Sequence, residues 1–136
     1  MLDGVSHLTV ERRCDVYRDY PPATARATFA ELEGDQRLER LVEEVCGYYE
    51  RTDPMMSMLR KDLGRSSALE QGFEVIRTGV DAYVLVALGP FSPSSTQVAV
   101  ARALLDDRTW ASLTGSLSDP SAAKRECLAL LCSVMS

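Results

Sequence analysis

Apolar residues recur every three or four positions along most of this chain, which is the spacing of one face of an α-helix. The clearest run begins after Asp35, where Leu38, Leu41 and Val45 lie on one side and charged residues fill the positions between them. We therefore expect a long helix over residues 35–52, with Asp35 as its N-cap. No segment alternates with period two. The pattern predicts an all-α fold, a helical bundle of about six to seven helices.

A proline follows this long helix. Pro54 has no backbone N–H and suits the first turn of a helix, so we expect a second, shorter helix over residues 54–63 with Asp53 as its N-cap. This second helix is rich in methionine, whose soft side chain adapts to ligands of varied shape, and two tyrosines before it would add hydroxyl groups. Ordinary core packing is the alternative for each single residue. The predicted pocket wall consists of Tyr48, Tyr49, Met55, Met56, Met58 and Leu59.

Glycine and proline mark the boundaries of the N-terminal elements. Short helices are expected over residues 10–20 and 23–33. Pro21-Pro22 breaks the first because proline clashes with the preceding turn, and Gly34 ends the second.

A further helix is expected over residues 68–88. Ser67 is its expected N-cap, and Glu70 completes an S-x-x-E capping box. The second half of this helix is nearly all apolar and should lie at the centre of the domain. Asp81 is embedded in that half. An i, i+4 ion pair with Arg77 is the simple explanation, and a polar anchor in a ligand cavity is the alternative, because a buried carboxylate needs a partner.

The C-terminal part alternates between helices and loops. The expected order is a loop over residues 89–95, a helix from Ser94 or Ser95 through Leu105, a stretch carrying Trp110 and Leu113, a loop over residues 115–119, and a final helix from Pro120 to Ser136. The end of the final helix is more apolar than one neighbouring helix requires. A partner helix from a second subunit would cover the excess.

Composition narrows the class of protein. With 136 residues the chain is long enough for one domain with a substantial core. A formal net charge of −5 argues against a nucleic-acid-binding surface, which is normally basic. No window approaches an uninterrupted apolar run of about 18 residues, so no membrane span or membrane partner is expected. The N-terminus lacks the pattern of a secretory signal, and we expect a cytoplasmic protein.

Little in the sequence points to catalysis. His7 is the only histidine and lies in the irregular N-terminal part, so no Ser/His/Asp or Cys/His set is expected in the folded interior. We therefore expect no enzyme, no metal and no other cofactor. The cysteines form no CxxC pair and are expected to be small buried apolar residues: Cys14, Cys46, Cys127 and Cys132.

Two segments resemble the effector domain of TetR/AcrR-type transcriptional regulators. The run Tyr-Tyr-Glu-Arg-Thr-Asp-Pro-Met-Met at 48–56, followed by Leu-Arg-Lys-Asp at 59–62, is similar to the segment with which that domain starts. Leu-Leu-Asp-Asp-Arg-Thr-Trp at 104–110 is similar to the segment before its last helix. The resemblance implies a ligand-binding and dimerisation domain over residues 34–136, after an irregular segment with short helices over residues 1–33.

A third segment is similar to the DNA-reading part of the same regulators. Gly-Val-Ser-His-Leu-Thr-Val at 4–10 resembles the opening of a TetR recognition helix, but Glu11 stands where a tyrosine is usual, and only three residues precede Gly4. A helix-turn-helix needs an upstream helix that braces the recognition helix. The likeness is therefore chance or a degenerate remnant, or the chain begins inside a longer regulator.

The resemblance also implies a function. Such a regulator binds a small apolar or amphipathic effector, which biases the arrangement of two subunits and thereby DNA affinity. Asp81 and Trp110 join the predicted ligand-binding residues. DNA is a partner only if a helix-turn-helix segment is supplied. The alternative is a stand-alone helical interaction module that binds neither ligand nor DNA.

The last two long helices of TetR-type domains pair with the same helices of a second subunit. We therefore expect a homodimer whose surface lies within residues 94–136. The expected interface residues are Val98, Ala101, Leu105, Cys127, Leu128, Leu131 and Val134.

Overall fold

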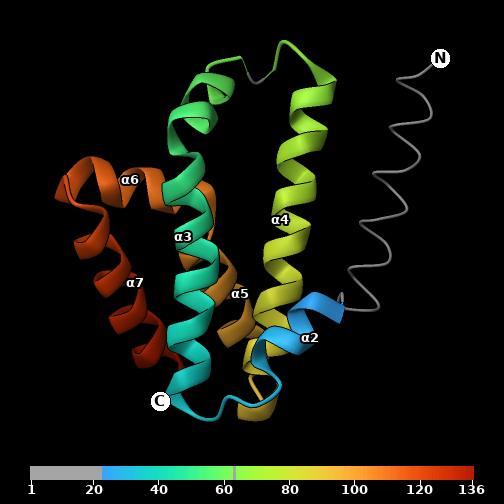
Figure 1. Cartoon of the computed structure of the whole chain (residues 1–136), viewed down its shortest axis with the longest axis vertical. Helices are drawn as coiled ribbons and strands as arrows, with labels where there is room; N and C mark the ends of the chain where they lie inside the picture. The colour runs from blue at the N-terminus through green and yellow to red at the C-terminus, as the bar shows by residue number, and fades with distance from the viewer. Residues whose placement is uncertain (1–22, 63) are drawn as a thin grey trace.

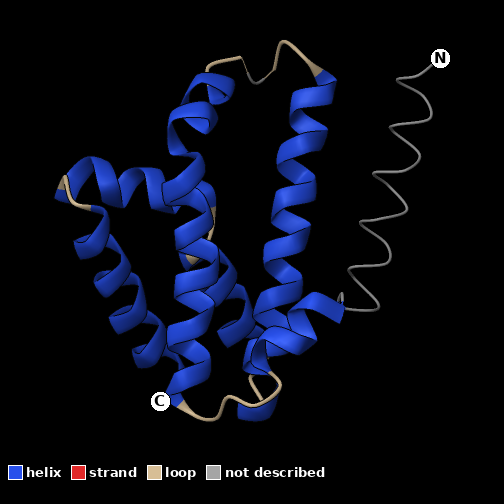
Figure 2. Cartoon of the chain, in the orientation of Figure 1, coloured by secondary structure: helices blue, strands red, loops and turns tan. Residues whose placement is uncertain are grey.

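The computed structural model describes residues 23–62 and 64–136, and its regular elements in that range are all helices (Figure 2). They are α2 Ala23–Phe29, α3 Asp35–Arg60, α4 Ser67–Leu88, the 3-10 turn η1 Gly89–Phe91, α5 Ser95–Leu104, α6 Asp107–Leu117 and α7 Pro120–Met135. The predicted all-α bundle is confirmed. The helix expected over residues 10–20 and the segment at 4–10, with His7 and Cys14, lie outside the described residues.

Two long helices, α3 and α4, run antiparallel and form the frame of the molecule (Figure 1). α3 packs between α4 and α7, α5 joins α4 to α7, and α2 packs on α4. The core lies where these helices meet, and its largest fully buried side chains include Phe29, Leu38, Leu41, Val84, Leu88, Leu105 and Leu131.

The second half of α4 enters the core with one face only. Ala82, Val84, Ala87 and Leu88 are buried, whereas the residues between them, among them Tyr83, are half-buried. The expectation that this half lies at the centre therefore holds for one face, because the other face borders a cleft described below.

α3 runs without a break through Pro54, so the expected division into two helices with Asp53 as an N-cap is wrong. A proline inside a helix removes one backbone hydrogen bond but need not end the helix when tertiary packing holds both sides of it. Before the proline, Tyr49 is buried in the core. After it, the Arg60 guanidinium pairs with the Asp107 carboxylate at 3.2 Å.

Two helix starts differ from expectation by one residue. α3 begins after Gly34, which has a φ of 54° and makes no side-chain cap, while Asp35 is already helical. A positive φ is a conformation that glycine adopts freely. Ser66, and not Ser67, caps α4 by accepting a hydrogen bond from the Leu69 N–H at 3.4 Å. The expected capping box at this helix therefore does not form.

The C-terminal helices follow the expected order. Ser94 caps α5 in a complete capping box with Gln97. α6 continues through Gly115, where a loop was expected, because a single glycine costs a helix only about 1 kcal/mol. Ser118 ends α6 in the left-handed conformation, with a φ of 57°. Pro120 opens α7, as expected.

Arg37 binds the chain where α2 ends, which is at Phe29 and not near residue 33. Its side chain is only 7% exposed. It donates hydrogen bonds to the carbonyl oxygens of Phe29, the last residue of α2, and of Leu32. It also donates to those of Val86 and Ala87 near the end of α4, and all four distances are 2.5 to 2.9 Å. The carbonyl oxygen of Phe29, which would accept from the Glu33 N–H if α2 continued, is thus bound to a side chain of α3.

Much of the apolar surface of α7 is covered within the chain, because α7 packs against α3, α5 and α6, but Leu130 remains 40% exposed. Four of the residues expected in a dimer interface are at most 1% exposed: Ala101, Leu105, Cys127 and Leu131. They face the core of their own chain, which corrects their assignment to a surface. The other three are half-buried: Val98, Leu128 and Val134. The homodimer itself stays a prediction.

Two cysteines lie where α3 meets α7. Cys46 and Cys127 are each 1% exposed, which confirms their expected role as small buried residues, while Cys132 is half-buried. A hydrogen bond with Cys127, together with burial, raises the pKa of the Cys46 thiol, so this thiol stays protonated.

Candidate functional site

A cleft of about 340 Å³ opens between α3 and α4. Residues at one-turn spacing line each wall, so each set occupies one helix face. The lining residues are Glu44, Val45, Tyr48 and Arg51 of α3, and Ile76, Gly79, Val80 and Tyr83 of α4. Because most of the exposed lining is apolar, the cleft suits an apolar or amphipathic molecule.

Gly79 leaves room in the α4 wall. A Cβ atom added there would meet no heavy atom within 4 Å. Glycine in a helix interior costs about 1 kcal/mol relative to alanine, so this position lowers helix stability while it widens the cleft. Gly72 is equally open but lies outside the cleft lining.

Four of the lining side chains carry a polar group: Glu44, Tyr48, Arg51 and Tyr83. The Glu44 carboxylate pairs with Arg40 of the same helix at 3.4 Å. The ring of Tyr48 contacts Tyr49 edge-on, and the ring of Tyr83 contacts Phe29 edge-on with centroids 5.9 Å apart. Aromatic contacts of this kind hold the rings of the two cleft tyrosines in place.

The structure separates the residues of the predicted pocket wall. Tyr48 lies in the cleft, whereas Met55 and Met58 are 55% and 70% exposed and line neither this cleft nor the second pocket described below. Leu59 is half-buried outside both. The side chain of Met56 is outside the described part of the structure. The methionines were placed in a pocket wall because a hinge at Pro54 would have folded them back, and α3 has no such hinge.

Tyr49 and Trp110 lie in the core. Each is 3% exposed, and their ring centroids are 6.4 Å apart. The Tyr49 hydroxyl donates a hydrogen bond to the Leu105 carbonyl oxygen at 2.6 Å. Burial, and secondly the nearby carboxylate of Asp107, raise the pKa of Tyr49, so its hydroxyl stays protonated. Both residues therefore join α3 to the corner between α5 and α6.

A second pocket, of about 280 Å³, lies between α4 and α5 and is more polar than the first. Tyr49 and Asp81 contribute to its lining. Asp81 pairs with Arg102 of α5 at 3.3 Å, and the expected i, i+4 pair with Arg77 is wrong. Arg77 instead pairs with Asp106 and Asp107 at the start of α6. Burial raises the pKa of Asp81, and the charge of Arg102 opposes this shift.

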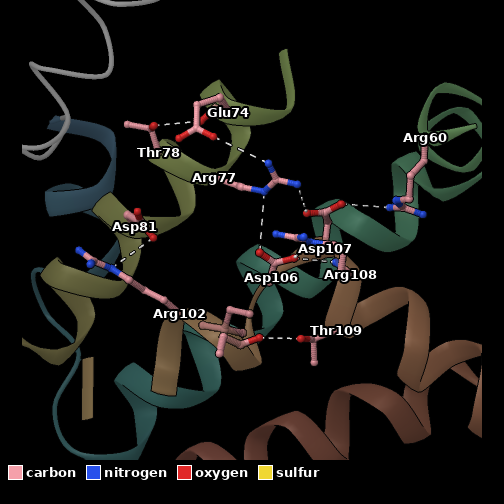
Figure 3. Close-up of polar contacts among 12 residues, drawn as sticks. Arg60, Glu74, Arg77, Thr78, Asp81, Arg102, Asp106, Asp107, Arg108 and Thr109 are labelled. Atoms are coloured by element: carbon pink, nitrogen blue, oxygen red, sulfur yellow. Dashed lines mark hydrogen bonds and ion pairs between the residues drawn. The ribbon is translucent and has the colours of Figure 1, made fainter. Parts of the chain in front are cut away.

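Asp106 and Asp107, an acidic corner at the start of α6, pair with residues of both walls of the first cleft (Figure 3). Asp107 is only 2% exposed. Arg60 at the end of α3 lies 3.2 Å from one carboxylate oxygen of Asp107, and Arg77 of α4 lies 3.5 Å from the other. Arg77 also lies 3.8 Å from Asp106. One buried carboxylate thus ties α3, α4 and α6 together.

No family model matches the chain, and neither a curated protein nor a solved structure matches it at a significant level. Within residues 23–62 and 64–136, no group of three or more His, Cys, Asp or Glu side chains is placed to hold a metal ion. No helix of this described part is long and apolar enough to span a membrane.

The α4 wall of the cleft was missed in the sequence. Ile76, Val80 and Tyr83 follow the helical spacing of one face, with Gly79 among them. An apolar face next to a glycine is a signal for a close approach or an open space. The nearly all-apolar run from 80 to 88 by itself predicts core packing. Only the position of α3 shows which face of α4 borders the cleft.

Proposed function

We propose that this chain is a small-molecule-binding module whose ligand occupies the cleft between α3 and α4. The observation that carries the proposal is the apolar cleft of about 340 Å³ between the two longest helices, with an open wall at Gly79. Its volume falls at the lower end of the range of small-molecule pockets, about 300–1,000 Å³. An apolar or amphipathic molecule would fit it, and the role is binding and not catalysis.

Ligand binding here would act on the rest of the fold through Asp107. Both cleft walls, α3 through Arg60 and α4 through Arg77, are ion-paired to this residue at the start of α6. A ligand that favours one separation of the walls would shift the position of α6. Such a shift requires unequal affinity for the two arrangements.

We further propose that the module serves a TetR-type transcriptional regulator as its effector-binding and dimerisation part. This step rests on the resemblance of residues 48–62 and 104–110, and on the all-α fold that such a domain requires. Control of transcription also needs a DNA-reading segment.

A stand-alone interaction module is the second candidate function. It is favoured by Met55 and Met58, large apolar side chains that are more than half exposed on the last turns of α3. Exposed methionines are common on surfaces that bind other proteins. In that case the cleft would hold no ligand.

Filling the cleft tests the main proposal. Gly79→Leu places a side chain into the open wall, while Gly72→Leu makes the same change on α4 outside the lining and gains the same helix propensity. We expect decanol, measured by calorimetry, to bind the wild type and Gly72→Leu alike and Gly79→Leu at least about tenfold more weakly.

Two results would contradict this proposal. If decanol binds Gly79→Leu as tightly as the wild type, the ligand does not occupy this cleft. If no apolar compound binds the wild type, the interaction-module function is favoured over ligand binding.

A further inference from the structure

Arg51 stands at the edge of the α3–α4 cleft without an ion-pair partner among the residues that the structure describes. Three glutamates that precede it on α3 are otherwise engaged, and the adjacent one, Glu50, pairs with Lys124 of α7 at 3.0 Å. Glu44 pairs with Arg40 at 3.4 Å, and Glu43 pairs with Lys124 of α7 at 3.3 Å. Arg51 therefore brings to the rim of the cleft a positive charge that forms no ion pair with a described carboxylate, although Glu43 Oε1 lies near the same face of Gly47.

Gly47 lets the Arg51 guanidinium lie against the surface of α3. A Cβ atom on Gly47 would come within 3.2 Å of Arg51 Nη1, a separation tighter than most such contacts. The absence of a side chain one turn before Arg51 therefore gives its head group room to lie close to the helix beside the cleft.

Two further donors belong to side chains that line the same cleft. The hydroxyls of Tyr48 and Tyr83, from opposite walls, make no hydrogen bond with a residue in the described part of the chain, although both side chains line the cleft. A phenolic hydroxyl donates readily to an anionic oxygen, and a guanidinium has donors only. The unsatisfied polar groups of the cleft thus match a hydrogen-bond acceptor that carries negative charge.

We infer that the ligand of this cleft is an amphipathic carboxylate, whose apolar body lies between Val45, Ile76 and Val80 and whose anionic head pairs with Arg51. This inference rests on the proposed ligand-binding function and names the chemical class of the ligand. A carboxylate matches the planar fork of an arginine and accepts two parallel hydrogen bonds from it. The net charge of −5 does not oppose this pairing, because salt screens charges beyond about 8–10 Å.

The test compares ligands of one chain length and different heads, all below their micelle concentrations. We expect the wild type to bind decanoate at least about tenfold more tightly than decanol. Arg51→Gln should lose this preference and retain its affinity for decanol. Arg125→Gln, which removes an exposed arginine from α7, should keep the preference. Arg51→Glu should reverse it and favour decylammonium over decanoate.

Three results would each contradict a different step. Equal affinity of the wild type for decanoate and decanol would overturn the carboxylate head while leaving the cleft as a binding site. A preference that survives in Arg51→Gln would remove Arg51 as its partner. Failure of both compounds to bind the wild type would overturn the proposed function itself.

Discussion

Arg37 places a positive charge inside the bundle, where its four hydrogen-bond acceptors are all backbone carbonyl oxygens. Two of them, Val86 and Ala87, lie in the last turn of α4. Phe29 ends α2, and Leu32 follows it. The carbonyl end of a helix carries partial negative charge. One arginine therefore supplies the partners that several terminal carbonyl groups would otherwise lack.

Removing this side chain should be costly. We expect Arg37→Met to lower the free energy of unfolding by about 3 kcal/mol, because buried carbonyl groups lose a charged donor. Arg125→Met, at an exposed position of α7, should change it by less than about 0.5 kcal/mol. Urea unfolding followed by the fluorescence of Trp110, the only tryptophan, measures both. Equal stability of the two variants would contradict this role.

Asp106 is the N-cap of α6 and accepts a hydrogen bond from the Arg108 N–H at 2.8 Å. Burial alone would raise the pKa of Asp106, but this hydrogen bond and the Arg108 charge lower it below its ordinary value. A carboxyl group with a lower pKa in the folded state adds stability above its ordinary pKa. That stability is lost as the pH falls through the lowered value.

Asp106→Asn isolates this contribution, because asparagine still caps a helix but does not titrate. We expect the free energy of unfolding of the wild type to fall more steeply than that of Asp106→Asn between neutral pH and about pH 3. Urea unfolding at a series of pH values measures the difference. Parallel curves for the two proteins would show that Asp106 has no lowered pKa.

At the scale of elements, Asp107 holds three helices together, since Arg60 of α3 and Arg77 of α4 both pair with it. Its partners are 25% and 29% exposed, so solvent weakens each pair. We expect Asp107→Asn to lower the free energy of unfolding by about 2 kcal/mol. Amide hydrogen exchange should become faster in the last turns of α3 and the first turns of α4.

A double-mutant cycle separates this clamp from a general loss of packing. Arg60→Gln should destabilise the wild type by more than it destabilises Asp107→Asn, with a coupling of at least about 0.5 kcal/mol. Additive effects would mean that the ion pair contributes nothing measurable.

The number and order of the helices could be predicted because each has a three- to four-residue apolar repeat and a boundary of serine, glycine or proline. α5 and α7 began where their caps indicated. The continuity of α3 through Pro54 could not be predicted, because local preference favours a new helix there. Burial before the proline and an ion pair 47 residues apart in sequence after it decide otherwise.

At the scale of the whole molecule, self-association is the prediction that the burial pattern changes most. Leu131 is fully buried, whereas Val100 of α5 and Leu130 of α7 are 38% and 40% exposed. If the chain forms a homodimer through these helices, as the resemblance implies, the exposed pair belongs to its surface. Leu131→Glu would then unfold the chain instead of producing folded monomers.

Light scattering after size-exclusion chromatography tests this. We expect a dimer for the wild type and folded monomers for the double variant Val100→Glu, Leu130→Glu, with helical circular dichroism unchanged. A monomeric wild type, or a double variant that stays dimeric, would contradict a dimer through α5 and α7.

The candidate site was only partly predictable. Tyr48 was recognised because it stands in an amphipathic helix near soft apolar residues. Ile76 and Tyr83 were not, because which face of α4 borders a cleft depends on the distance to α3. The lack of an ion pair at Arg51 could not be predicted either. In the structure Glu43 pairs with Lys124 and Glu44 pairs with Arg40, and the first of these contacts depends on where α7 lies.

One measurement tests the central claim most directly. Ile76 is the only isoleucine of the chain and lines the α3–α4 cleft, so labelling isoleucine δ1 methyl groups gives a single NMR signal from the site. We expect this signal to shift in a saturable manner when decanol is added, while the methyl signal of Met135 on α7 stays in place. A bound ligand that leaves the Ile76 signal unmoved would contradict a binding site between α3 and α4.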